Sequence, residues 1–174
     1  MTIDEPVHLE AYNPLWPQYF ERERQRIADA LRLNISRVEH IGSTAVSGLC
    51  AKPIVDIMVG TGAFPPREQV AIRLSELGYQ ALGEAGVPGR LYFRRRDTIS
   101  FNVHVVEWEG RHWKPNLALR DYLRAHPDEA ARYGKAKVAA AQSGGTSLLQ
   151  YSEAKSAVVS DLLSRALVWG NRSA

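Results

Sequence analysis

Apolar residues recur at helical spacing near the start of the chain and again through its last third. A first helix is expected to start at Asn13-Pro14, because asparagine caps helices and proline is accepted in a first turn. Its apolar face continues to about residue 32 and consists of Trp16, Tyr19, Phe20, Ile27 and Leu31. The last third is expected to form three helices, over residues 116–125, 127–142 and 147–168, with Ser143-Gly144-Gly145 as a hinge between the last two.

Short runs of β-branched and apolar residues between these helices predict strands. Residues 37–41 form one, and residues 54–59 are apolar enough for a buried strand. Residues 91–95 and 99–107 predict a hairpin that turns at Arg96-Asp97-Thr98.

One more helix is expected between the strands. It begins at Pro66 and stops at Gly78, and residues 85–89 are expected to form a flexible loop. Strands that enclose one helix and are flanked by others predict an α+β domain with a mixed sheet and a helical C-terminal third. A chain of 174 residues is long enough for one core, so we expect a single domain over residues 1–174.

Composition narrows the class of protein. A charged fraction of 24% is ordinary for a folded soluble chain, and no segment has the hydropathy of a signal peptide or of a membrane span. The single cysteine, Cys50, excludes an intrachain disulfide and fits a reducing compartment. We therefore expect a cytoplasmic protein without a membrane partner.

The net charge of +3 is unevenly distributed along the chain. Residues 90–137 hold 11 Lys or Arg against 6 Asp or Glu, whereas residues 1–89 hold 8 against 11. The basic segment either meets an anionic partner or is simply a solvated surface. The excess is small and lacks interleaved aromatic residues, so nucleic acid is not the expected partner.

Gly42 and Ser43 are candidates for an anion site. Glycine lets the backbone approach a ligand closely, and a serine at a helix start offers a hydroxyl beside unpaired amide groups. The alternative is an ordinary turn in which Ser43 or Thr44 caps a short helix that ends near Gly48.

Asp56 is a carboxylate in the middle of an apolar strand. Its burial is costly unless it is paired, protonated or bound to a metal such as Mg²⁺, which prefers carboxylate oxygens. Strand alternation places Ile54 and Met58 on its face and therefore no second acid of its own strand. The alternative is an ion pair with a nearby lysine or arginine.

His104 lies on the later strand, on the same face as Asn102. With Asp56 it is a candidate metal ligand or general base, and alternatively it is a hydrogen-bonded histidine of the core. Arg94 and Arg96, on one side of the hairpin, are candidates for binding phosphate or carboxylate.

Two pairs spaced by four residues stand out in the helical third. In each, Tyr133 with Lys137 and Tyr151 with Lys155, the two side chains lie one above the other on a helix. The pairs either line a cleft for an anionic ligand or pack a lysine stem over a ring. Arg120 is expected to pair with a carboxylate of the sheet.

The stretch RVEHIGSTAVSGLCAKPIVDIMV, residues 37–59, resembles the signature of the GrpB family. The family's usual form reads Glu-His-Ile-Gly-Ser-Thr, then Val-Pro-Gly-Leu, then Ala-Lys-Pro-Ile-Ile-Asp-Ile. The resemblance covers nearly the whole chain, including the NVHVVE strand, the LRDYLRAHPDEAARYGKAK segment and the YSEAK helix. This chain departs from it at Ser47, where proline is usual, at Asn102, where histidine is common, and at residues 117–119, which lack a phenylalanine.

The resemblance implies a nucleotidyltransferase-like fold, in which a Gly-Ser turn holds nucleotide phosphates and sheet carboxylates hold a divalent metal. Gly42 and Ser43 match that turn, and Asp56 matches the first metal carboxylate. Met58 stands at the second carboxylate's position, and His104 lies on the strand expected to carry the third.

From this resemblance we expect a metal-dependent enzyme that transfers a nucleotidyl group from a nucleoside triphosphate to a small molecule. Asp56 and His104 are the catalytic and metal candidates, with one Mg²⁺ or Mn²⁺ ion, or Zn²⁺, which accepts imidazole. The candidate nucleotide and phosphate contacts are Gly42, Ser43, Thr44, Lys52, Arg94, Arg96, Lys137, Tyr151 and Lys155. The alternatives are a catalytically inactive nucleotide- or metabolite-binding module and, third, acid–base hydrolysis by His104 and Asp56.

Overall fold

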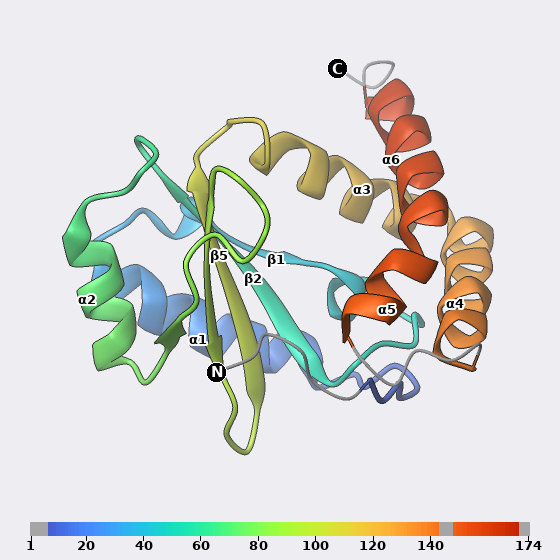
Figure 1. Ribbon diagram of the computed structural model, residues 1–174, viewed down its shortest axis with the longest axis horizontal. Coiled ribbons are helices and arrows are strands. Elements are labelled where there is room, and N and C mark those ends of the chain that lie inside the picture. The colour runs from blue at the N-terminus through green and yellow to red at the C-terminus, as the bar shows by residue number, and fades with distance from the viewer. Residues whose placement is uncertain (1–6, 143–147, 171–174) are drawn as a thin grey trace.

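A mixed five-stranded sheet forms the centre of one half of the molecule in the computed structural model, which describes residues 7–142 and 148–170 (Figure 1). The central strands β2 and β5 pair in parallel, and the other pairs are antiparallel. The sheet confirms the predicted α+β class with a mixed sheet. In spatial order its strands are β1 (Val38–Ile41), β2 (Ile54–Thr61), β5 (Ser100–Glu107), β4 (Arg90–Arg95) and β3 (Gln80–Ala81).

The helices α1 (Trp16–Leu31) and α2 (Glu68–Glu76) cover one face of this sheet (Figure 1). The predicted start at Asn13 is close, because Asn13 Oδ1 accepts a hydrogen bond from the Leu15 amide at 2.9 Å and the helix begins at Trp16. A 3₁₀ turn, η1 (Ile35–Arg37), leads from α1 into β1. The main core between these helices and the sheet includes Trp16, Phe20, Ile27, Val38, Val55, Ile57, Val59, Leu74, Phe93, Phe101, Val103 and Val105.

The C-terminal third is helical and lies beside the sheet (Figure 1). Its helices are α3 (Trp113–Ala125), α4 (Pro127–Gln142), α5 (Leu148–Ala154) and α6 (Ser156–Gly170). The prediction of one helix over 147–168 is wrong, because the chain breaks at Lys155 into α5 and α6. The predicted hinge at residues 143–145 lies outside the described residues.

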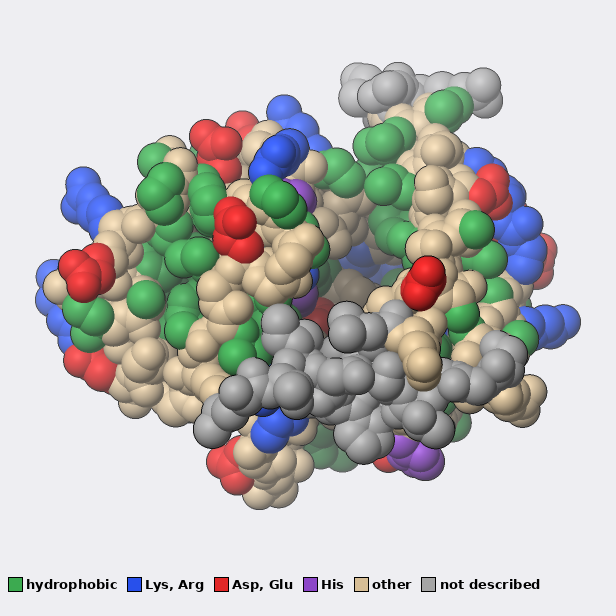
Figure 2. All heavy atoms as spheres, viewed as in Figure 1, with side chains coloured by type: hydrophobic (Ala, Val, Ile, Leu, Met, Phe, Trp, Pro, Cys, Tyr) green, Lys and Arg blue, Asp and Glu red, His purple; other side chains and the backbone are tan. Residues whose placement is uncertain are grey.

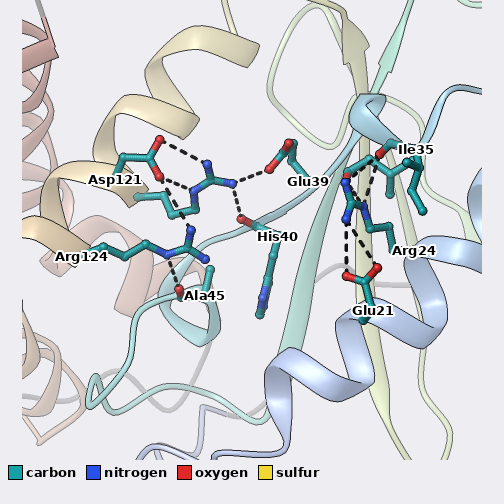
Figure 3. Close-up of polar contacts among 10 residues, drawn as sticks. Glu21, Arg24, Ile35, Glu39, His40, Ala45, Asp121 and Arg124 are labelled. Atoms are coloured by element: carbon teal, nitrogen blue, oxygen red, sulfur yellow. Dashed lines mark hydrogen bonds and ion pairs between the residues drawn. The ribbon is translucent and has the colours of Figure 1, made fainter. Parts of the chain in front are cut away.

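The β1–β2 connection joins the two halves. Val46 and Leu49 of this connection pack in the core of the helical third, with Tyr122, Leu123, Ala130, Tyr133, Leu162 and Ala166. Figure 3 shows the polar part of the same junction, where Asp121 and Arg124 of α3 lie close to Glu39, His40 and Ala45. Arg124 Nε donates to the Ala45 carbonyl at 2.8 Å, so α3 fixes the turn that follows β1.

The second face of the sheet carries the polar candidates. Asp56 pairs with Asn102 in the β2–β5 register, and Met58 pairs with His104, so these four side chains lie on one face. Met58 is fully buried in a small apolar core with Ile41, Val106 and Trp113. The position expected for a second carboxylate therefore belongs to the core between the sheet and α3.

A hollow separates the sheet half from the helical half in the space-filling view (Figure 2). Acidic, basic and histidine side chains are visible at its floor. Within the residues that the structure describes, no helix combines the length and the apolar character needed to cross a membrane.

Candidate functional site

The turn after β1 lies directly against Asp56. The antiparallel register places Ile41 opposite Asp56, so Gly42 follows beside the carboxylate. Gly42 has a φ of +70°, and a β-carbon there would lie 2.7 Å from Asp56 Oδ2. Backbone conformation and available space therefore both require glycine at this position.

The short helix predicted to end near Gly48 is a single 3₁₀ turn, η2, over residues Ser43–Ala45. The alternative that Ser43 caps it is wrong, because the Ser43 hydroxyl accepts a hydrogen bond from Lys137 Nζ at 2.9 Å and makes no capping bond. Thr44 Oγ1 lies 3.0 Å from His40 Nε2, inside the protein. One 3₁₀ turn has almost no helix dipole, so attraction of an anion here depends on side chains.

Asp56 accepts hydrogen bonds from two side chains of β5. Asn102 Nδ2 lies 2.7 Å from Asp56 Oδ1, and His104 Nε2 lies 3.3 Å from the same oxygen. Burial acts to raise the pKa of Asp56, but the interaction with His104, the Asn102 hydrogen bond and the charge of Lys52 outweigh it and lower the pKa to about 2. Asp56 is therefore ionised at neutral pH.

Two lysines of the helical third reach the same place. Lys137 is only 1% exposed, and its Nζ donates to Ser43 Oγ and to a backbone carbonyl. Both predicted tyrosine–lysine pairs form, with Lys137 Nζ 4.8 Å from the Tyr133 ring centroid and Lys155 Nζ 4.7 Å from that of Tyr151. Burial lowers the pKa of each lysine to about 8.

These side chains surround a pocket of about 50 Å³. At about 12 Å³ for each water-sized group, this space suits one small anion the size of a phosphate group. Three lysines and one carboxylate give the pocket an excess of positive charge. Its lining residues are Ser43, Thr44, Ala51, Lys52, Ile54, Asp56, Lys137, Tyr151 and Lys155.

The structure thus brings together most of the residues singled out in the sequence, but two arginines lie elsewhere. Arg94 Nε donates to Gln80 Oε1 at 3.1 Å, and Arg96 donates to Asn102 Oδ1 at 2.9 Å. Neither arginine lines the pocket. Asn102 connects Arg96 to Asp56, since it accepts from Arg96 and donates to Asp56.

The donor set does not fit the expected metal. The residues that the structure describes contain no group of three or more His, Cys, Asp or Glu side chains able to hold an ion. Asp56 Oδ1 already accepts two hydrogen bonds, from Asn102 and His104. A magnesium ion needs near-octahedral oxygen ligands at about 2.1 Å, which Asp56 and His104 do not offer among neighbouring ammonium groups.

Three residues around the site carry no signal in their own spacing that marks them as functional. Tyr92 donates from its hydroxyl to Asn102 Oδ1 at 2.7 Å, and Arg90 Nη1 lies 3.4 Å from His104 Nδ1. These contacts hold the two side chains that bind Asp56. Buried His40 supports Thr44, and its place in the EHIGST motif is the one signal that could have found it. Tyr133, which its spacing did single out, supports Lys137.

A larger groove of about 830 Å³ lies at the other end of the molecule, between the end of α1, the loop after β2 and the start of α2. None of the candidate residues lines it. The small basic pocket is the better candidate, because its polar groups converge and its lysines have shifted pKa values.

Comparison with known sequences and structures gives one consistent family. The GrpB protein family matches residues 6–165. A UPF0157 protein of Streptomyces coelicolor is 38% identical over 162 residues, which span 92% of this chain and 84% of the relative. The crystal structure of the conserved protein GrpB from Enterococcus faecalis aligns with a TM-score of 0.82 and 33% identity, over 92% of this chain and 97% of that one.

Some relatives are longer than this chain. UPF0157 protein YqkA of Bacillus subtilis is 32% identical over 150 residues, which cover 86% of this chain but only 44% of YqkA. A dephospho-CoA kinase of Mycobacterium bovis is 28% identical over 194 residues, covering 95% of this chain and 47% of that protein.

Proposed function

The chain belongs to the GrpB family, and we propose that it binds the phosphate groups of a nucleotide or of a similar phosphorylated metabolite in the pocket between β2 and the helical third. The observation that carries the proposal is Lys137, a cation 1% exposed that faces this pocket. Among the described residues its Nζ has only neutral partners, Ser43 Oγ and the Cys50 carbonyl. A buried ammonium without an anion is costly, and a bound phosphate would supply the anion.

The other pocket residues support the same ligand. Lys52 and Lys155 add two cations, and Ser43, Thr44 and Tyr151 add hydroxyl groups that can donate to phosphate oxygens. The pocket has space for one phosphate group only. The remainder of a nucleotide would extend into the hollow between the two halves (Figure 2).

One comparison points towards nucleotide-containing ligands. The mycobacterial relative that matches 95% of this chain is named dephospho-CoA kinase. Because this chain is similar to part of that protein, nucleotides are the first ligands to test.

Calorimetric titration with ATP tests the proposal. We expect binding to the wild-type chain, and we expect Lys137→Met to weaken the affinity by about tenfold or more, since a lost charge-assisted hydrogen bond costs at least about 1.4 kcal/mol. Lys135→Met is the matched control, because Lys135 lies on the same helix but is exposed. Equal affinities for the two variants would contradict the role of Lys137, and absence of binding to every phosphate compound would contradict the function.

Nucleotidyl transfer is a second candidate, favoured by the two lysines whose pKa of about 8 is close to neutral pH. An acceptor hydroxyl would attack the α-phosphorus of the bound triphosphate, its proton would pass to solvent, and the bond to pyrophosphate would break. Lys137 or Lys155 would stabilise the charge on the leaving pyrophosphate and donate a proton to it. Asp56, with a pKa of about 2, is too weak a base to deprotonate the acceptor, and its role is to fix the lysines electrostatically.

Release of pyrophosphate in the presence of a panel of small acceptors tests this second candidate. We expect Lys155→Met to abolish the release and Lys135→Met to leave it unchanged. Asp56→Asn keeps the shape of the side chain but removes its charge, and undiminished release by that variant would contradict the part given to Asp56.

A further inference from the structure

Lysine side chains stand close to Asp56, where the family resemblance implies divalent metal. Lys52 and Lys155 line the same pocket of about 50 Å³ as Asp56. The charge of Lys52 acts on Asp56, and the charge of Asp56 acts on Lys155.

One carboxylate oxygen of Asp56 is already engaged in hydrogen bonds. Oδ1 accepts from Asn102 at 2.7 Å and lies 3.3 Å from His104 Nε2. Oδ2 lies beside Gly42, because a β-carbon added to that glycine would be 2.7 Å from it. A dication in this place would have to displace these contacts and then lie beside ammonium groups of its own sign.

The position expected for a second carboxylate is also closed. Met58 is 0% exposed and packs with Ile41, Val106 and Trp113 between the sheet and α3. A carboxylate at that position would point into apolar packing and not into the pocket. Among the described residues that line the pocket, Asp56 is therefore the one carboxylate that a metal could use.

We propose that the ammonium groups of Lys52, Lys137 and Lys155 take the place of divalent cations, so that the pocket binds the metal-free form of a nucleotide or other polyphosphate. This inference rests on the proposed function and names the form of its ligand. Metal-free ATP carries the full negative charge of its phosphates, whereas in the magnesium complex that charge is partly neutralised. The lysines are therefore expected to prefer the metal-free form.

The test is a calorimetric titration of the whole chain with ATP, once with EDTA and once with Mg²⁺ at increasing concentrations. We expect binding in EDTA, with an apparent Kd that rises on addition of Mg²⁺ in proportion to the ratio of total to free ATP, as mass action requires when only free ATP binds. Titration with Mn²⁺ alone, followed by electron paramagnetic resonance, is expected to show no binding.

Lys155→Met and Lys155→Glu sharpen the test, since Lys155 is half-buried in the turn between α5 and α6 and belongs to none of the apolar cores. Lys155→Met should weaken binding of free ATP, with Lys135→Met as the unchanged control. Lys155→Glu places a second carboxylate in the pocket and should abolish binding in EDTA while creating binding of Mn²⁺.

The outcomes separate this inference from the function on which it rests. Tighter binding of ATP in Mg²⁺ than in EDTA, or binding of Mn²⁺ alone to the wild-type chain, would overturn the inference and leave the nucleotide function standing. Binding of inorganic pyrophosphate in EDTA without binding of ATP would support the inference and overturn the nucleotide. Absence of binding by ATP, pyrophosphate and phosphate in both media would overturn both.

Discussion

Gly42 determines how closely the β1–β2 connection approaches Asp56. Its φ of +70° and ψ of −169° lie in a region that is open essentially to glycine alone. The same residue brings η2 into contact with the carboxylate, so that one backbone conformation sets both the turn and the pocket wall.

We expect Gly42→Ala to destabilise the chain more than Gly48→Ala does. Both positions have positive φ, at +70° and +78°, which costs roughly 1–2 kcal/mol for alanine. Only at position 42 would the new β-carbon also lie 2.7 Å from Asp56 Oδ2, whereas nothing lies within 4 Å at position 48. Denaturant unfolding measures the stability of both variants. Equal losses of stability would show that Asp56 moves away from the new β-carbon at no cost in free energy.

His40 makes the stability of the chain sensitive to acid. Burial lowers its pKa to about 4, more than the attraction of Asp56 raises it, and the ring is 4% exposed and stacked on Phe20. Above about pH 6.5 the imidazole is neutral in both the folded and the unfolded chain. Below that pH the unfolded chain takes up the proton first, so stability falls as pH falls from about 6.5 to about 4.

Between about pH 7 and pH 5 this linkage removes roughly 2 kcal/mol from the free energy of unfolding. Denaturant titrations at the two pH values measure it. His40→Gln keeps a polar group near Thr44 but does not titrate, so its loss over this range should be much smaller. His8→Gln, at an exposed position, should lose as much stability between the two pH values as the wild-type chain does. If His40→Gln also loses as much stability as the wild-type chain, another group is responsible for the effect.

At the scale of elements, a buried ion pair joins α1 to the sheet. Glu23 is 3% exposed, and its oxygens accept hydrogen bonds from Arg95 of β4 at 2.9 and 2.8 Å and from the Tyr79 hydroxyl at 2.9 Å. One carboxylate therefore holds α1, β4 and the segment after α2 in a single arrangement.

Glu23→Gln is expected to lower the free energy of unfolding by about 3 kcal/mol, because it leaves Arg95 largely buried without a carboxylate. Glu21→Gln removes the exposed carboxylate that pairs with Arg24 and should cost less than about 1 kcal/mol. Thermal and denaturant unfolding compare the two, and similar small losses would mean that solvent compensates for the missing pair.

The sequence predicts helices and strands well where the apolar pattern continues over many residues. The α1 face and the β4–β5 hairpin follow from their spacing, and the GrpB resemblance is confirmed by the family match. The break at Lys155 is not predictable, because neither glycine nor proline interrupts Ala154-Lys155-Ser156. The two-residue strand β3 is too short to show any period.

Only the residues of the candidate site that lie close together in the sequence can be placed together by prediction. Gly42, Ser43 and Asp56 are close in the sequence, and strand pairing brings them together. The alternative that Ser43 caps a helix fails for a physical reason, since its hydroxyl binds Lys137, which lies 94 residues away, and not the backbone of its own turn. Arg94 and Arg96 have the positive charge that a phosphate contact requires. Their side chains instead bind Gln80 and Asn102, and neither arginine lines the pocket.

At the scale of the whole molecule, the pocket lies where the two halves meet. Arg120 of α3 donates to Glu39 Oε2 of β1 at 2.6 Å, which confirms the predicted pairing with a carboxylate of the sheet. The lysines of the helical third then face the carboxylate of the sheet. A ligand that binds there bridges both halves.

Binding of phosphate across this junction should weaken in alkali. Because burial lowers the pKa of Lys137 and Lys155 to about 8, both lysines lose their protons as pH rises through 8, while phosphate groups are already fully ionised. We expect affinity for ATP to fall about tenfold or more between about pH 7 and pH 9.5, and binding near pH 8 to take up protons. Calorimetry in buffers of different ionisation enthalpy measures the uptake.

A pH profile that is flat for the wild-type chain would contradict this assignment of charges. Lys137→Met should flatten the profile in part, because one of the two titrating cations is removed, whereas Lys135→Met should leave it unchanged.

The distance along the chain between Ser43 and Lys137 has a consequence for synthesis. Asp56 and Lys52 belong to the part of the chain that is translated early, whereas Lys137 is translated 94 residues later than Ser43. Chains fold progressively from the N-terminus as they emerge, so a partly made chain can build the β1–β2 turn while it lacks two of the three pocket lysines. Capture of the ligand would then distinguish finished molecules from nascent ones.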